Sequence, residues 1–150
     1  MRSIATRVRE LRASDKLRWD LLWAGYLQFY QHELAAEITE LTWRRLIDPG
    51  FDLHGLVALD GEQVIGLMHY HFHISTWSAT SYCYLEDLFV DPVARGKGAG
   101  RALIEAVYRA ADVRKAERVY WATQSNNAQA RKLYDQLARL TPFVQYCRDT

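Results

Sequence analysis

The residues best suited to chemistry form a basic, glycine-rich loop between a predicted strand and a predicted helix. The loop, RGKGAGR, spans residues 95–101. Glycine has no Cβ, so its backbone amides can approach a ligand closely. Amides at a helix N-terminus are unpaired and lie at the positive end of the helix dipole, which favours anions. Arg95, Lys97 and Arg101 add positive charge. The loop therefore predicts a site for a phosphorylated ligand, in particular a diphosphate.

Two common phosphate-binding patterns do not fit this loop. A Walker loop needs G-x-x-x-x-G-K-[ST], which the residues after Gly96 do not supply. A dinucleotide loop needs G-x-G-x-x-G, and Arg101 stands three residues after Gly98. The pattern present is Arg-x-x-Gly-x-Gly, with Arg95, Gly98 and Gly100 in its fixed places. Taken alone, it is equally typical of a glycine-rich strand-to-helix turn with surface basic residues.

A second pattern lies about thirty residues downstream of the loop. Residues 117–124 are rich in β-formers, residues 125–127 (SNN) are typical of a helix cap, and residues 128–138 are helical in character. The spacing Asn-x-x-Ala-x-x-Leu-Tyr is formed by Asn127, Ala130, Leu133 and Tyr134. Together the two patterns resemble the GNAT superfamily of N-acetyltransferases, and the resemblance covers residues 56–148. The loop would then bind the pyrophosphate of acetyl-CoA.

The resemblance implies a specific set of ligand-binding residues. Expected to bind acetyl-CoA are Leu88, Phe89, Val90, Arg95, Gly96, Lys97, Gly98, Ala99, Gly100, Arg101, Asn127 and Tyr134. The phrases YLEDLFVDP, VYWATQSNN and TPFVQY are most similar to the branch containing fungal histone and polyamine acetyltransferases. One departure is the sequence LAR at residues 137–139, where the family commonly has Leu-Gly-Phe or Leu-Gly-Tyr. Loss of that glycine affects the end of the helix and removes no catalytic group.

Acetyl transfer to an amine requires a base, because an alkylammonium has a pKa of about 10.4 and no free lone pair. Glu86 and Asp87, on the strand before the loop, are the candidate bases. Adjacent strand residues point to opposite faces, so only one of the two is expected to line the site. The family often uses the carboxylate at the Glu86 position through a water, which favours Glu86. Either residue could instead form an ion pair or anchor the loop.

The resemblance also assigns the remaining catalytic groups. Tyr134 is the candidate acid, since its phenol can donate to the departing sulfur. A backbone amide near Phe89 or Val90 would stabilise the charge that develops on the thioester oxygen. Asn127 would bind the pantetheine arm, cap the helix, or do both. Helix periodicity alone would place Tyr134 in an apolar stripe facing the core.

Three histidines alternate with aromatic residues at His69, His71 and His73. On a strand their imidazoles share one face, with neighbours about 7 Å apart. Zinc ligands must converge more closely, so no metal site is expected. The histidines form either a polar, partly exposed face of the sheet or a group that contacts the substrate or relays its proton.

The elements that position these residues follow from periodicity and turn chemistry. Strands are predicted at residues 5–11, 53–59, 63–74, 80–90 and 117–124. Helices are predicted from residue 15 to an end near Gly25 or Tyr30, and at 34–47, 101–115 and 128–138. Asp60-Gly61 predicts a tight hairpin turn. A short C-terminal strand is expected at Phe143–Cys147. This order, βααβββαβα plus a strand, predicts an α/β (α+β) fold with a mixed, mostly antiparallel sheet between helices, which is the order of the GNAT fold.

Composition is compatible with one intracellular catalytic domain spanning residues 1–150. A net charge of +1 gives no electrostatic case for nucleic-acid binding. Two cysteines, Cys83 and Cys147, are too few for a disulfide framework, and no apolar run is long enough to span a bilayer. A cytoplasmic location and no membrane partner are expected, and the branch resemblance suggests a homodimer.

The sequence thus predicts acetyl transfer from acetyl-CoA to a primary amine by direct attack in a ternary complex. The acceptor is left open among a polyamine, an amino acid, a small amine and a protein lysine. Two alternatives remain: a non-catalytic acyl-CoA-binding regulatory domain, and a nucleotide-binding domain that uses the same loop.

Overall fold

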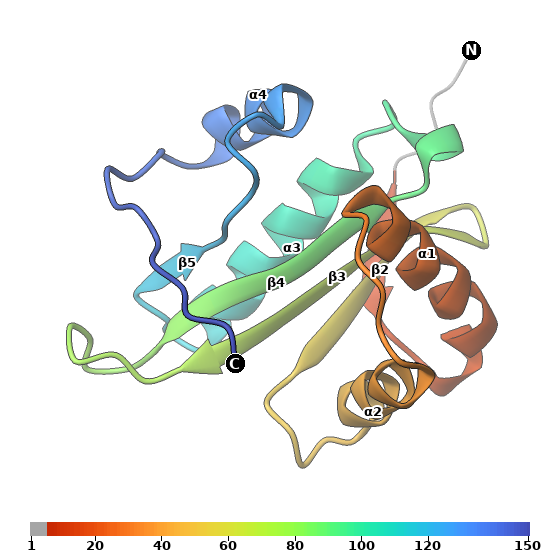
Figure 1. The fold of residues 1–150 in the computed structure, drawn as a ribbon, viewed down its shortest axis with the longest axis horizontal. Helices are drawn as coiled ribbons and strands as arrows, with labels where there is room; N and C mark the ends of the chain where they lie inside the picture. The colour runs from red at the N-terminus through yellow and green to blue at the C-terminus, as the bar shows by residue number, and fades with distance from the viewer. Residues whose placement is uncertain (1–5) are drawn as a thin grey trace.

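The computed structural model describes residues 6–150 and contains one five-stranded sheet with helices on both of its faces (Figure 1). Its main elements are β1 (Arg7–Glu10), α1 (Lys16–Phe29), α2 (Ala36–Ile47), β2 (His54–Asp60), β3 (Gln63–His73), β4 (Tyr82–Val90), α3 (Ala99–Val113), β5 (Arg118–Tyr120) and α4 (Ala128–Leu137). The strands lie in chain order; β1 to β4 are antiparallel, and β5 is parallel to β4. The predicted mixed, mostly antiparallel sheet between helices is confirmed.

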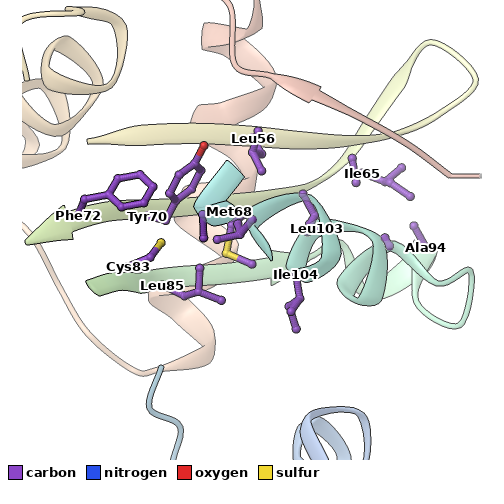
Figure 2. Packing of buried hydrophobic residues seen from close by; sticks show 14 residues of the cluster. Leu56, Ile65, Met68, Tyr70, Phe72, Cys83, Leu85, Ala94, Leu103 and Ile104 are labelled. Carbon is purple, nitrogen blue, oxygen red and sulfur yellow. The ribbon is translucent and has the colours of Figure 1, made fainter. Parts of the chain in front are cut away.

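Helix α3 covers one face of the sheet because it connects two parallel strands and must cross over them. Its residues Leu103, Ile104 and Val107 recur at helical spacing and are fully buried. They pack against Met68 on β3 and Leu85 on β4 in one apolar cluster (Figure 2). This cluster fixes the N-terminal end of α3 beside the end of β4, which is where the glycine-rich loop lies.

Helices α1 and α2 cover the opposite face. Trp19 of α1 and Trp43 of α2 pack against Val57, Leu67 and Phe89 of the sheet. Alternate side chains of each strand thus enter two different cores, as the period of two in a strand requires.

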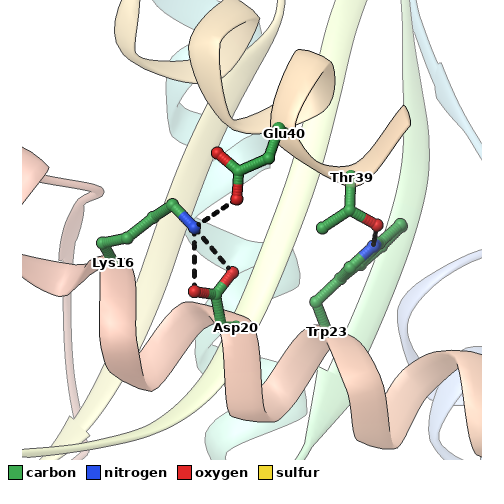
Figure 3. Close-up of polar contacts among 5 residues, drawn as sticks. All are labelled: Lys16, Asp20, Trp23, Thr39 and Glu40. Carbon is green, nitrogen blue, oxygen red and sulfur yellow. Dashed lines mark hydrogen bonds and ion pairs between the residues drawn. The ribbon is translucent and has the colours of Figure 1, made fainter. Parts of the chain in front are cut away.

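Polar contacts tie α1 to α2 (Figure 3). The Lys16 Nζ lies 2.8 Å from Asp20 on its own helix and 2.8 Å from Glu40 on α2. One turn further along, the Trp23 indole N–H donates to the Thr39 hydroxyl over 3.3 Å. These contacts hold α1 in place, so that its C-terminal end can border the candidate site.

Most predicted boundaries agree with the structure to within a few residues, and the hairpin at Asp60-Gly61 forms as predicted. Gly61 has a φ of +60°, a backbone conformation that glycine adopts without strain. Residue 5 of the predicted first strand lies outside the described residues. The predicted strand at 117–124 is shorter, because β5 pairs with β4 only over Arg118–Tyr120.

The C-terminal strand predicted at Phe143–Cys147 does not form. Its sequence has the right residue types, but a strand also needs a neighbouring strand to bond with. The segment pairs with no strand in the described part of the chain, and its apolar side chains stay in solvent. Phe143 is 76% exposed and Tyr146 is 93% exposed.

Candidate active site

A groove of about 370 Å³ opens where β5 separates from β4. The two strands pair only from Tyr82 to Tyr84, so the rest of β4 has no partner on that edge. The groove is bordered by this free edge, the loop before α3, the C-terminal end of α1, and α4. Among the predicted ligand-binding residues, those that line it are Leu88, Phe89, Val90, Arg95, Gly96, Gly98, Ala99, Gly100, Arg101, Asn127 and Tyr134.

The glycines of the loop have two different roles. Gly96 and Gly98 have φ values of +86° and +82°, which favour glycine over other residues. A Cβ added at either position would meet no atom within 4 Å, so the backbone there is open to a ligand. A Cβ on Gly100 would instead lie 3.3 Å from Leu133. A side chain at Gly100 would therefore require Leu133 of α4 to shift by a few tenths of an ångström, a contact that the position of Gly100 in the motif did not reveal.

The three basic side chains of the loop also diverge. The Arg95 guanidinium lies 5.8 Å from the centroid of the Phe89 ring, at the edge of the groove. Arg101 also lines the groove and donates a hydrogen bond to Gln136 of α4. Lys97 does not line it, because its ammonium pairs with Asp60 at the end of β2, 2.7 Å away. The Lys97 side chain is thus held at the end of β2, and binding of acetyl-CoA by Lys97 stays a prediction.

At the other wall of the groove, Asn127 caps α4. Its side-chain oxygen accepts from the Ala130 amide over 3.4 Å, and its amide nitrogen donates to Thr123 over 3.2 Å. The capping role considered for Asn127 is thus observed.

Tyr134 lies on α4, half-buried in the wall of the groove. Its ring packs edge-on against Trp121 at 5.4 Å between centroids. Burial, with a smaller contribution from Tyr30, raises the pKa of Tyr134 to about 12. The phenol therefore keeps its proton at neutral pH and can act as a hydrogen-bond donor in the groove.

Sequence reasoning missed several residues of the groove. These are Phe29 and Tyr30 at the end of α1, and Gln129, Ala130 and Leu133 on α4. The α4 residues share the helix face of Tyr134 or adjoin it, so helix periodicity could have indicated them. Phe29 and Tyr30 were missed because nothing local in the sequence brings the end of α1 next to the loop.

A β-bulge changes the expected arrangement of the two carboxylates. His69 of β3 pairs with Asp87 while Tyr70 pairs with Leu85, so Glu86 is the extra residue on β4. Glu86 approaches His71 at 3.6 Å, and Asp87 approaches His69 at 2.9 Å. Since His69 and His71 share one face of β3, both carboxylates lie on that face. The prediction that Glu86 and Asp87 point to opposite faces is wrong, because strict alternation fails at a bulge.

The two hydrogen bonds of the buried His69 determine which of its ring nitrogens carries the proton. The Trp19 indole can only donate, so its 3.0 Å contact makes His69 Nε2 an acceptor. The proton is then on Nδ1, which donates to Asp87 over 2.9 Å. This hydrogen bond holds the Asp87 carboxylate in place. The pKa of Tyr26 is raised, mainly by burial and secondly by the nearby charge of Asp87. His69 has no nitrogen free to accept a proton, whereas Glu86, with a half-exposed side chain, is accessible.

The structure offers no metal centre within residues 6–150, where no three potential ligands among His, Cys, Asp and Glu converge. None of the described helices has the length and apolar character needed to cross a membrane.

Comparison with known proteins names the family to which this fold belongs. The sequence pattern of the acetyltransferase (GNAT) family matches residues 16–138, and the chain belongs to that family. It is an N-acetyltransferase whose acetyl donor is acetyl-CoA and whose acceptors are amines.

Individual relatives agree with this assignment. The chain is 38% identical, over 95% of its length and 89% of the relative's, to D-amino-acid N-acetyltransferase HPA3 of Saccharomyces cerevisiae. It is 30% identical to the uncharacterized N-acetyltransferase YhfO of Bacillus subtilis, over 93% of its length and 95% of the relative's. Among solved structures, AAC(6')-Iy in complex with a CoA bisubstrate analog superposes with a TM-score of 0.84 at 17% identity, covering 98% of this chain and 99% of the other.

Proposed function

We propose that this protein transfers the acetyl group of acetyl-CoA directly to the nitrogen of a small primary amine, with both substrates bound at once. The observation that carries the proposal is the groove itself. A basic, glycine-rich loop, an unpaired strand edge and a protonated tyrosine all line it.

The residues of the groove fit the chemical parts of acetyl-CoA. The open amides at Gly96 and Gly98, at the start of α3, suit the pyrophosphate, with Arg95 and Arg101 beside them. The unpaired edge of β4 offers backbone groups to the amide-containing arm. When bound, acetyl-CoA supplies the thioester whose carbonyl carbon the amine attacks.

The protein groups take the following roles in the proposal, with Glu86 lying outside the residues that line the groove. Glu86 lies on the face of the sheet that carries His69 and His71, which we call the histidine face. There it accepts the proton of the ammonium through a water. A backbone amide near Phe89 or Val90 donates to the thioester oxygen as negative charge develops there. Tyr134 donates a hydrogen bond to the departing sulfur, which is a weaker base than a phenolate of pKa about 12.

Direct transfer is favoured over a covalent enzyme intermediate by the state of the cysteines. Burial raises the pKa of Cys83 to about 12, so the nucleophilic thiolate is scarce at neutral pH. Cys147 lies in the exposed C-terminal segment and does not line the groove.

The acceptor is proposed from the relatives. HPA3 is named as a D-amino-acid N-acetyltransferase, which supports an amino acid or a similar small amine. The fungal histone and polyamine branch, suggested by sequence phrases alone, leaves a polyamine or a protein lysine as the second candidate.

The function can be tested with two variants of the loop. Gly98→Leu should weaken acetyl-CoA binding more than tenfold by calorimetry and lower CoA release in an amine panel, because a side chain would enter the groove. Arg95→Glu should weaken binding similarly, since a charged hydrogen bond contributes about 1.5–3 kcal/mol.

Gly61→Leu is the matched control for the loop. Gly61 also has a positive φ and open space around it, but it lies in the β2–β3 turn. The control should lose comparable stability and bind acetyl-CoA normally. Unchanged binding in both loop variants would remove the loop from the donor site. Normal binding by the wild type without CoA release for any amine would favour the regulatory-domain alternative, and tighter binding of ATP than of CoA would favour a nucleotide-binding domain.

We further propose that the chain is a single catalytic domain, acts in the cytoplasm and forms a homodimer. The dimer is supported by the apolar C-terminal segment, in which Leu140, Phe143 and Val144 are 73–78% exposed. Light scattering after gel filtration should give twice the chain mass, and deletion of residues 140–150 should reduce it to one chain.

A further inference from the structure

A row of aromatic side chains lies on the sheet beside Glu86, outside the groove. We call it the aromatic face, and it consists of His71, His73, Tyr82, Tyr84 and Tyr120. The strand register explains it: His71 pairs with Tyr84, His73 with Tyr82, and Tyr84 with Tyr120, so all five side chains lie on one side. The five are only partly buried, and Tyr120 remains 36% exposed.

The aromatic face is held together by its own contacts. The His73 Nδ1 donates to the Ile74 carbonyl over 2.8 Å, and its Nε2 shares a 2.7 Å hydrogen bond with the Tyr120 hydroxyl. The rings of Tyr84 and Tyr120 are 4.8 Å apart. Burial raises the pKa of both tyrosines, so both are uncharged phenols at neutral pH. The face is therefore an ordered aromatic surface with uncharged phenols at Tyr84 and Tyr120.

Strand β4 connects this face to the donor groove. Tyr82 and Tyr84 belong to the face, Leu88 to Val90 line the groove, and the bulge at Glu86 lies between them. A molecule resting on the aromatic face would thus have one end beside Glu86, at the point where β5 leaves β4. An acceptor amine has to reach the same point to meet the thioester.

The charges around the face are few and lie at its two ends. Glu86 stands at one end, with half of its side chain exposed. Arg118 stands at the other, with its guanidinium 4.8 Å from the centre of the Tyr82 ring. Asp87 is occupied by His69 and is only 12% exposed, so it offers little to a second cation.

We propose that the aromatic face binds the body of the acceptor, and that the acceptor is a primary monoamine bearing an aromatic or bulky apolar group. The inference rests on the proposed acetyl transfer. One carboxylate suits one ammonium, and a surface of packed aromatic rings suits an aromatic or apolar body. A polyamine fits poorly, because its further ammonium groups would meet Arg118, and Asp87, the other carboxylate of the bulge, is engaged by His69.

The test compares amines on the wild type and on variants of the face. Phenethylamine and the amino acid phenylalanine, in both enantiomers, represent the proposed class; ethylamine and spermidine represent a small amine and a polyamine. We expect a phenyl-bearing amine to have a kcat/KM at least about tenfold above that of ethylamine or spermidine, since the ring buries substantial apolar area. Tyr84→Leu and Tyr120→Ala should remove most of this preference while acetyl-CoA affinity by calorimetry stays unchanged. Arg118→Glu should raise kcat/KM for spermidine several-fold.

Other outcomes would overturn the inference without touching acetyl transfer. Spermidine as the best acceptor of the wild type would do so, as would face variants that lower kcat/KM equally for every amine. If Tyr120→Ala instead dissociates a dimer and affects all amines alike, the face is an interface between two copies. Absence of acetylation of any amine despite normal acetyl-CoA binding would count against the proposed function, and with it against the inference. Thermal melts of each variant separate these results from loss of folding.

Discussion

Replacement of Tyr134 by phenylalanine should lower kcat by about 10²–10⁴-fold and leave the fold intact. The substitution keeps the ring, and with it the edge-on contact with Trp121. It removes only the hydroxyl, which has no protein hydrogen-bond partner among the described residues. Because the pKa of Tyr134 is raised to about 12, its hydroxyl stays protonated at any ordinary assay pH. Only the substitution therefore removes this donor. Steady-state kinetics, with acetyl-CoA affinity measured by calorimetry, checks the prediction.

Tyr108→Phe provides the control. The Tyr108 hydroxyl donates to the Leu137 carbonyl at the end of α4, over 2.8 Å. Its loss should cost about 1 kcal/mol of stability and leave kcat near the wild-type value. If Tyr134→Phe melts normally and turns over at the wild-type rate, Tyr134 is a wall residue and another group assists the sulfur.

The fold was predictable because local signals agreed with one another. The Asp60-Gly61 turn, the helical spacing of Leu103, Ile104 and Val107, and the cap at Asn127 each specify one element, and each forms. The C-terminal strand was not predictable, because strand pairing depends on a partner that the segment itself does not contain. The same limit applies to β5, whose apolar pattern continues beyond the point where the strand leaves β4.

The candidate site was predictable where a residue acts through its backbone or its helix position, and less so where tertiary contacts decide. Gly96 and Gly98 line the groove as expected, since their conformation is local. The Lys97 side chain does not line the groove, because it forms an ion pair with Asp60 from a distant part of the sequence. The bulge that brings Glu86 and Asp87 to one face is a property of the pairing between β3 and β4. No spacing within β4 encodes it.

The Glu86→Gln variant should bind acetyl-CoA normally and lose the largest share of its rate near neutral pH. There the acceptor is almost entirely an ammonium, whose pKa is about 10.4, and a base must remove its proton. As the pH rises toward that pKa, free amine arrives already deprotonated, so much of the loss should be recovered. The pKa of Tyr134, raised to about 12, keeps the phenol protonated across this range, so the recovery is not masked by loss of the acid. The ratio of wild-type to variant kcat/KM, measured from pH 7 to pH 10 or so, should fall steadily.

Asp87→Asn is the matched control, and the structure makes it a sharper one than sequence suggested. Both side chains lie on the histidine face, yet Asp87 accepts the His69 Nδ1 proton while His69 Nε2 is held by Trp19. An asparagine there should lower the melting temperature. Its amide oxygen can still accept the hydrogen bond from His69 Nδ1, but it lacks the negative charge that strengthens this bond. Its remaining activity should keep the wild-type pH profile. A pH-rescued defect in Asp87→Asn and none in Glu86→Gln would reverse the assignment. If neither variant shows it, the base is a neighbour with a free nitrogen, and His71, 3.6 Å from Glu86, is the group that the geometry leaves.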